Sequence, residues 1–316
     1  MSTYYTSKYS GEQIDEAVKK IMDGEMTGDY ADRQLSNLDT PQAALSNLGA
    51  GVRPNLLVNP RFQVNQRSQT SYSGTYGVYT VDGWLLSNAG AATVNVLSDG
   101  VQIVAGTTTA QFRQYLESLP DGVYTLSFLF ADGSLGYAVY EKSGTAYTRK
   151  DYTPSNVWGM GMQDTSGKPT AYMYVQAGMS AAPVASKLES GEGQTLAYQD
   201  DTGAWQLLPQ PESDYATQLA KCQRYYLPID QMEYRAGQVG TNYISFSVPT
   251  PVTMRTNPVL AGTANIKATN GTTQSGFAIS FVTRGGIARA YAAQNAHGLT
   301  DAIIAFESGS ALSAEL

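Results

Sequence analysis

The chain has 316 residues and a formal net charge of −7, and this length allows about two domains. The acidic balance, with no visible basic cluster, argues against nucleic-acid binding, because phosphate contacts need clustered Lys and Arg. A single cysteine and a single histidine exclude an internal disulfide and the usual thiolate metal sites, so no metal and no cofactor are expected. No apolar run is long enough for a signal peptide or a membrane span, which predicts synthesis in a cytoplasm and no membrane insertion.

Charged residues make up 15% of the chain, where about 25% is typical of globular proteins. The chain is instead rich in glycine, with 31 residues, and in tyrosine, with 22. Tight turns and hydroxyl-bearing side chains of this kind favour strands over helices. The composition therefore predicts a mainly β protein.

Two short helices are predicted at the start of the chain. The first begins with the capping-box pair Ser10 and Gln13 and ends near Gly24. The second has Thr40 as its N-cap and Pro41 in its first turn. Neither apolar stripe is long enough to be stable alone in water. The helices either pack on the following domain or, as we favour, pack on copies of themselves or on a partner.

From about residue 55 the apolar period changes from 3.6 to 2, which indicates strands. In the clearest strand, at 123–130, Tyr124, Leu126 and Phe128 fall on one face. Trp84 opens a strand and is expected in the core. Further predicted strands cover 92–97, 101–104, 111–116, 136–141, 171–175 and 184–188. About eight short strands before residue 208 predict a central antiparallel β-sandwich of jelly-roll type.

A helix that connects two β regions is predicted next. Ser213 and Asp214 cap its start, and Pro228 prevents its continuation. Its apolar side is formed by Tyr215, Leu219, Cys222 and Tyr226. Cys222 is therefore expected to be a buried small apolar residue and not a reactive nucleophile.

Beyond this helix five or six more strands predict a small second sandwich. Ile244, Phe246 and Val248 alternate in one strand, and the other strands cover 258–266, 277–282, 287–291 and 302–306. The predicted organisation is a helical segment at 1–52, a jelly-roll domain at 53–210, a connector helix at 211–228 and a β-sandwich at 229–316.

Several short phrases of the sequence occur in an order that resembles a known family. They are SGEQIDEA at 10–17, NLDTPQAALSNLGA at 37–50, NLLVNPRF at 55–62, NQR at 65–67, VDGW at 81–84, KLE at 187–189, LAKCQRYY at 219–226 and MRTNP at 254–258. Together they resemble tail fibre or receptor-binding proteins of phages and prophages of Gram-positive, gut-type bacteria, and of phage-tail-like bacteriocins.

This resemblance implies a homotrimer in a virion tail or a tail-like bacteriocin particle, assembled in the host cytoplasm. It implies that residues 1–52 attach to a tail baseplate protein, that 53–210 is similar to a carbohydrate-binding module, and that 229–316 is a receptor-binding tip. The chain departs from the family pattern at 189–206, where GEG at 191–193 and DDTG at 200–203 lengthen a loop.

The expected ligand is a bacterial cell-surface polysaccharide, such as a wall glycan or a teichoic-acid-like polymer. Sugar sites combine aromatic faces with hydrogen-bonding side chains in shallow grooves. In the central domain the candidate residues are Trp158, as the best exposed aromatic, with Tyr152 and Asn156 close by in a loop-like stretch. The alternative for Trp158 is a loop anchor that packs on the sandwich.

In the C-terminal domain, polar candidates gather around two turns. They are Arg284, Arg289, Tyr291, Asn295 and His297, and Arg and Tyr are frequent at binding hot spots. The alternatives are a solvated hairpin end or a trimer contact. For His297 a surface or core-edge imidazole is favoured over a catalytic base.

An enzyme, in particular a polysaccharide depolymerase, is the less favoured class. Glycoside hydrolysis needs two carboxylates at a defined separation, and the adjacent pair Asp200 and Asp201 is more typical of a solvated turn. The same two residues are an equally unspecific sequence signal for a calcium site. A Ser-His-Asp triad could use only His297, and no Gly-x-Ser-x-Gly motif is present. No catalytic residue is therefore predicted. A structural tail adaptor or decoration protein remains the alternative to receptor binding.

Overall fold

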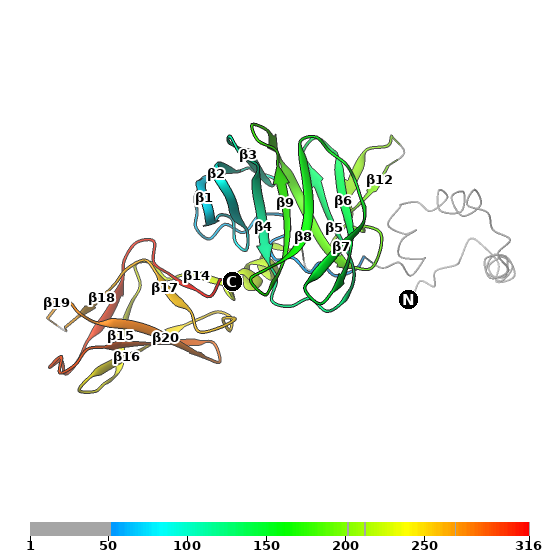
Figure 1. Ribbon diagram of the computed structural model, residues 1–316. Coiled ribbons are helices and arrows are strands. Elements are labelled where there is room, and N and C mark those ends of the chain that lie inside the picture. Colours follow the sequence, from blue (N-terminus) through cyan, green and yellow to red (C-terminus); the bar gives the residue numbers. More distant parts are fainter. Residues whose placement is uncertain (1–51, 201, 212, 269, 316) are drawn as a thin grey trace, which may run out of the picture. The chain divides into compact units, whose positions relative to one another are not determined.

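The computed structural model describes residues 52–200, 202–211, 213–268 and 270–315. Residues 53–316 form one compact unit of antiparallel sheets with one short helix among the described elements (Figure 1). The predicted mainly β fold, with sandwiches and a connecting helix, is confirmed. The helices predicted near 10–24 and 40–49, and the attachment role of 1–52, lie outside the described residues.

The central sandwich has two sheets. The larger has the order β10-β3-β2-β4-β9-β8, with β1 also paired to β2, and the smaller has the order β11-β5-β6-β7. The strands of the larger sheet are β1 (Ser71–Tyr79), β2 (Leu85–Val96), β3 (Val101–Ala105), β4 (Ala110–Tyr115), β8 (Trp158–Thr165), β9 (Lys168–Val175) and β10 (Ser180–Ala181). Those of the smaller sheet are β5 (Gly122–Phe130), β6 (Leu135–Ser143), β7 (Ala146–Tyr152) and β11 (Pro183–Ser190). The chain crosses between the sheets after β4, β7 and β10, as is typical of jelly-roll sandwiches.

Aromatic rings fill the space between these sheets. Trp84 is fully buried and stacks on Phe112, with 4.8 Å between ring centroids, and Phe62 packs against the same indole at 5.2 Å. The expectation that Trp84 belongs to the core is confirmed. Such rings remove large apolar areas from water, so this cluster supplies much of the stabilisation of the sandwich.

The smaller sheet is buried on its outer face as well. Alternate residues of β5 face the main core, but Leu129 joins a second cluster with Leu135, Ala185, Leu196 and Ala197. The hairpin of β12 (Ala197–Gln199) and β13 (Trp205–Leu207) contributes to this cluster. The lengthened loop at 189–206 is thus a folded cover of the smaller sheet.

A buried amine fixes this cover to β11. The Lys187 side chain is fully buried, and its Nζ donates to Thr195 Oγ1 at 2.6 Å and to Gln210 Oε1 at 2.7 Å. Glu189, also fully buried, accepts from Arg53 Nε at 2.9 Å. Burial lowers the pKa of Lys187 to about 8, against the opposing effect of Glu189. The charged side chains of Arg53, Lys187 and Glu189 thus join the first residues of the unit to the loop at 189–206.

The connector helix is α4 (Tyr215–Gln223), and Asp214 is its N-cap, accepting from the Thr217 amide at 2.9 Å. Its buried residues are Gln218 and Cys222, so the expectation for Cys222 is confirmed. Tyr215 is exposed, which corrects its predicted place on the apolar side.

The end of this helix also differs from the prediction. The chain already leaves the helix at Arg224, and Pro228 lies in the short strand β14 (Tyr226–Pro228). Pro228 therefore does not end the helix. Tyr226, predicted on the helix side, instead pairs with Ser313 in a sheet.

The C-terminal sandwich has a three-stranded sheet, β14-β23-β17, and a larger sheet of order β19-β18-β22-β15-β16-β21-β20. Its remaining strands are β15 (Glu233–Val239), β16 (Tyr243–Pro249), β17 (Val259–Ala261), β18 (Ala264–Lys267), β19 (Thr273–Gln274), β20 (Ala278–Arg284), β21 (Ile287–Ala293), β22 (Ile303–Phe306) and β23 (Ala311–Ser313). The predicted alternation of Ile244, Phe246 and Val248 is confirmed, because all three are buried. In the part of the chain described, no helix is long and apolar enough to cross a bilayer.

Candidate ligand-binding site

A pocket of about 600 Å³ opens where β7 and β8 meet at the edges of the two central sheets. Figure 1 shows these strands, with the crossing segment 153–157 between them in the chain. The lining residues are Arg149, Tyr152, Thr153, Pro154, Ser155, Asn156, Trp158, Gly159, Met160 and Tyr174. The structure thus brings all three central candidates, Tyr152, Asn156 and Trp158, to one place, which we call the β7–β8 pocket.

An irregularity in β7 directs two of these side chains into the pocket. Tyr140 of β6 pairs with Arg149 and Val139 pairs with Asp151, so Lys150 is an extra residue in β7. In a regular strand, residues three apart point to opposite faces. The bulge restores Arg149 and Tyr152 to the same face, and such bulges commonly redirect side chains.

The two side chains contact each other. The guanidinium carbon of Arg149 lies 4.0 Å from the centroid of the Tyr152 ring, which is the geometry of a cation–π contact. Tyr152 is 47% exposed, so the stack forms an open wall of the pocket.

Tyr174 forms another wall because its partner on β8 is a glycine. Gly159 pairs with Tyr174, and a Cβ built on Gly159 would lie 2.3 Å from the tyrosine ring. Gly161 pairs with Tyr172 in the same way, and its Cβ would lie 2.4 Å from that ring. Each ring therefore lies over a glycine of the edge strand. A ring that covers a glycine of an edge strand is a known device for stabilising sheet edges.

Trp158 has a different role from the one predicted. It begins β8, is only 8% exposed, and stacks on Phe130 with 4.5 Å between centroids. The interpretation as an exposed aromatic is wrong and the alternative, packing on the sandwich, is what the structure shows, although Trp158 lies in a strand and not in a loop. Trp158 lines the pocket but is nearly buried, so Tyr152 and Tyr174 are the more exposed rings there.

The crossing segment carries the polar groups of the pocket. Ser155 Oγ accepts from the amides of Val157 at 3.1 Å and Trp158 at 3.3 Å, and these bonds fix the turn before β8. Asn156 is exposed on this turn and lines the pocket. Its amide can both donate to and accept from a hydroxyl group.

The C-terminal candidates are divided between two ends of a hairpin. Arg284 lies at the turn that joins β20 to β21, whereas Asn295 and His297 follow the far end of β21. Arg289 and Tyr291 lie between them on the outward side of β21, because Ala288, Ala290 and Ala292 face the core. The structure therefore does not gather these five residues into one site.

His297 lines a separate depression of about 630 Å³ with residues such as Gly240, Thr241 and Thr300. Its Nδ1 accepts from the Leu299 amide at 3.1 Å, so this nitrogen is occupied by the backbone. The nearest acid along the chain, Asp301, forms an ion pair with Arg235 at 3.1 Å. The arrangement fits an imidazole that holds its own loop, a role that the sequence did not predict.

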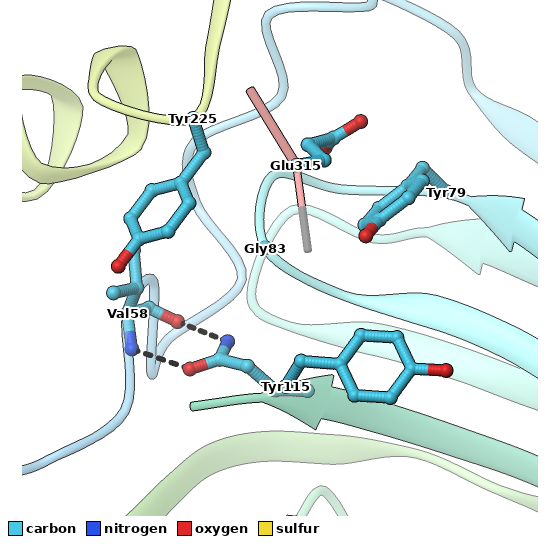
Figure 2. A pocket seen from close by; sticks show the side chains of 7 residues that line it. Val58, Tyr79, Gly83, Tyr115, Tyr225 and Glu315 are labelled. Carbon is cyan, nitrogen blue, oxygen red and sulfur yellow. Dashed lines mark hydrogen bonds between the residues drawn. The ribbon is translucent and has the colours of Figure 1, made fainter. Parts of the chain in front are cut away.

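A much smaller cavity, of about 20 Å³, lies beside the connector (Figure 2). It is lined by Val58, Tyr79, Gly83, Gln114, Tyr115, Tyr225 and Glu315. The Val58 amide donates to Gln114 Oε1 at 2.7 Å, and Gln114 Nε2 donates to the Val58 carbonyl at 2.8 Å. This volume suits about one water molecule and is too small for a sugar.

A buried ion pair lies next to this cavity. Arg67 Nη2 donates to Glu315 Oε2 at 2.6 Å, and the Arg67 guanidinium stacks on Tyr226 with 3.8 Å to the ring centroid. Both charged side chains are nearly buried. Burial raises the pKa of Glu315 to about 7, although Arg67 opposes this rise. The pair joins the end of the C-terminal sandwich to the central one.

The acidic turn considered for catalysis or calcium organises its own hairpin. Asp200 accepts from the amides of Thr202 at 2.9 Å and Ala204 at 3.0 Å, and from Gln206 Nε2 at 2.8 Å. The hydrogen bond from Thr202 Oγ1, at 2.6 Å, together with that from Gln206 and the amide bonds, lowers the pKa of Asp200 to about 2. Asp201 lies outside the described residues. Among the residues that the structure describes, no three possible metal ligands cluster.

Sequence reasoning missed Arg149, Gly159 and Tyr174. A signal for β8 was present, because Trp158, Met160 and Met162 alternate with smaller or polar residues. A second signal was the pair of tyrosines, Tyr172 and Tyr174, in a predicted strand. The bulge at Lys150 had no local signal, because it depends on pairing with β6. Neither protein-family models nor curated proteins match this sequence.

Proposed function

We propose that this protein is a phage tail fibre or receptor-binding protein that binds a bacterial surface glycan. In this proposal residues 1–52 attach the chain to a baseplate protein and the β domains contact the cell. The particle is a virion tail or a tail-like bacteriocin, assembled in the host cytoplasm. The order of sequence phrases supports the viral assignment, and the β7–β8 pocket supports the ligand.

The composition of the pocket is the observation that carries the ligand class. Sugars present weakly apolar faces and hydroxyl edges, and their sites pair aromatic rings with amide and hydroxyl groups. Tyr152 and Tyr174 offer rings, and Asn156 with Thr153 offers hydrogen-bonding groups. The volume of about 600 Å³ lies within the roughly 300–1,000 Å³ of small-ligand sites.

Binding is favoured over hydrolysis because of the chemistry of this lining. Glycosidases place two carboxylates on either side of the scissile bond. The described residues that line the pocket are aromatic, cationic, amide, hydroxyl or apolar, and none is an Asp or Glu. The pocket therefore offers contacts for a sugar without the usual acid and base.

Homotrimeric display would compensate for a weak single contact. A shallow sugar site is expected to bind with a Kd on the order of millimolar. Linked copies on a repeating polymer can raise the effective affinity by roughly 10² to 10⁴ without a new contact. We therefore expect the trimer to bind cells even though one pocket binds feebly.

The first experiment is binding of the labelled full chain to a panel of intact Gram-positive gut bacteria. We expect binding to a narrow set of strains, lost after chemical removal of wall glycopolymers. A chain that lacks residues 1–52 should still bind these cells but fail to enter tail particles. Native mass measurement should give a trimer at micromolar concentration.

The result that would overturn the proposal is a trimer that binds no strain. A structural adaptor or decoration protein would then be the better account, and the tail partner would be the next target. Loss of cell binding on deletion of 1–52, with the trimer retained, would also contradict the assigned division of roles.

A further inference from the structure

The β7–β8 pocket holds a cation that has no acidic partner. Arg149 is exposed and forms none of the ion pairs found among the described residues. Five of the ten arginines between residues 53 and 316 do form such ion pairs, for example Arg61 with Asp99 and Arg235 with Asp301. A guanidinium without an acidic partner in a ligand pocket is a candidate recognition group.

The acidic residues nearest in sequence are engaged elsewhere. Glu141 accepts from Lys150 Nζ at 2.5 Å, and Asp151 accepts from the Tyr137 hydroxyl at 3.0 Å and from the Tyr152 amide at 2.8 Å. The bulge separates these groups from Arg149, because Asp151 pairs with Val139 on the other face of the sheet. The charge of Arg149 is therefore not neutralised by its own strand.

Tyrosines surround Arg149 instead. Its guanidinium stacks on Tyr152, and its charge opposes the burial that raises the pKa values of Tyr140 and Tyr172. Stacking holds the planar group by its face and leaves N–H donors at its edge. That edge matches the two oxygens of a carboxylate or a phosphate, with which Arg forms bidentate hydrogen bonds.

We propose that Arg149 recognises an anionic substituent, a carboxylate or a phosphate, on a saccharide that lies against Tyr152 and Tyr174. This inference rests on the proposed glycan-binding function and adds the charge class of the ligand. A chain with a net charge of −7 repels anions at long range. A local cation without an acidic partner is therefore needed to make such a ligand favourable, and it selects against neutral sugars.

The test measures binding of the full chain to three immobilised polymers: poly(glycerol phosphate), polygalacturonate and a neutral glucan. Wild type should bind at least one of the two anionic polymers more tightly than the glucan. Arg149→Gln should weaken that binding by about tenfold to a hundredfold, as expected for loss of a charge-assisted bond. Comparison of poly(glycerol phosphate) with polygalacturonate shows whether the recognised group is a phosphate or a carboxylate.

Lys150→Gln is the matched control. It removes the same charge from the next residue of β7, but Lys150 pairs with Glu141 and does not line the pocket. It should leave binding unchanged. Arg149→Lys keeps the charge without the planar fork and should fall between wild type and Arg149→Gln.

Three results would overturn the inference. These are equal loss in both glutamine variants, no loss in Arg149→Gln, and wild-type binding to the glucan as tight as to the anionic polymers. In each case binding to intact cells in the same assay would show that glycan recognition itself survives. If the wild-type chain binds none of the polymers and none of the cells, the proposed function is overturned together with the inference.

Discussion

The central sandwich is built around a stack of Trp and Phe rings, whereas the C-terminal sandwich combines buried phenylalanines with many alanine and aliphatic side chains. In β21 the buried positions are Ala288, Ala290 and Ala292, and Ala290 lies in register between Phe246 and Phe281. In the central core, Trp84 stacks directly on Phe112. The same antiparallel architecture therefore encloses two different kinds of core.

The two regions differ correspondingly at their surfaces. The β7–β8 pocket has aromatic and cationic walls that continue from the aromatic core through Trp158. The depression at His297 is lined mainly by glycine, threonine and small apolar residues. Glycan contacts need ring faces, so the comparison favours the central sandwich as the binding domain.

The largest expected effect comes from Trp84→Ala in the central core. Loss of the stacked indole and the resulting cavity should lower the free energy of unfolding by about 3–5 kcal/mol. Phe246→Ala is the matched change in the C-terminal core, where the ring is also buried. The two transitions can be separated by fluorescence, because the remaining tryptophans, Trp158 and Trp205, both lie in the central region.

If the two cores are separate, Phe246→Ala should disturb far-UV circular dichroism at lower denaturant than tryptophan fluorescence. Coincident curves for both variants would show that the regions unfold together and would contradict the division into two cores.

The next effect concerns the ion pair that joins the regions. Burial raises the pKa of Glu315 to about 7, from about 4.5 for an unperturbed glutamate, so the folded state binds the proton of Glu315 more tightly than the unfolded state does. Protonated Glu315 therefore raises the free energy of unfolding by an amount on the order of 1–3 kcal/mol. This stabilisation is fully present below about pH 4.5 and is lost as pH rises towards 7. Glu315→Gln should flatten the pH profile of unfolding in this window.

Asp301→Asn is the control for that measurement, because Asp301 pairs with the exposed Arg235 at the surface and such pairs contribute little. A profile for Glu315→Gln that is as steep as that of wild type would contradict the assigned role of Glu315.

Gly159→Ala tests how the pocket is built. The new methyl group would meet the Tyr174 ring and displace it, so glycan affinity should fall about tenfold, or about 1.4 kcal/mol. Gly237→Ala in β15 is a suitable control, because its Cβ would meet only the Ser245 carbonyl at 3.9 Å. Unchanged binding in Gly159→Ala would mean that the Tyr174 ring does not contact the ligand.

The smallest expected effect is at the connector. Asp214→Ala removes the side-chain acceptor of the Thr217 amide and should cost about 1 kcal/mol of unfolding free energy. Asp214→Asn keeps an N-cap acceptor and should cost less. Equal losses in the two variants, measured by denaturant unfolding, would show that the cap bond contributes nothing.

Features set by neighbouring residues were predictable from the sequence. The cap of α4 at Asp214 depends on residues three positions apart, and the alternation in β16 depends on one strand. Features that depend on distant pairing were not predictable. The burial of Trp158 against Phe130 and the position of Arg149 beside Tyr152 both require the registers of β6, β7 and β8.

The most direct test of the central claim compares Tyr174→Ala with Tyr291→Ala for binding to a susceptible strain. Each variant removes one tyrosine ring, from the β7–β8 pocket and from the outward side of β21 respectively. We predict that Tyr174→Ala loses cell binding while Tyr291→Ala retains it. Circular dichroism should show that both variant chains are folded. Retained binding in Tyr174→Ala, with loss in Tyr291→Ala, would contradict the assignment of the glycan site to the central sandwich.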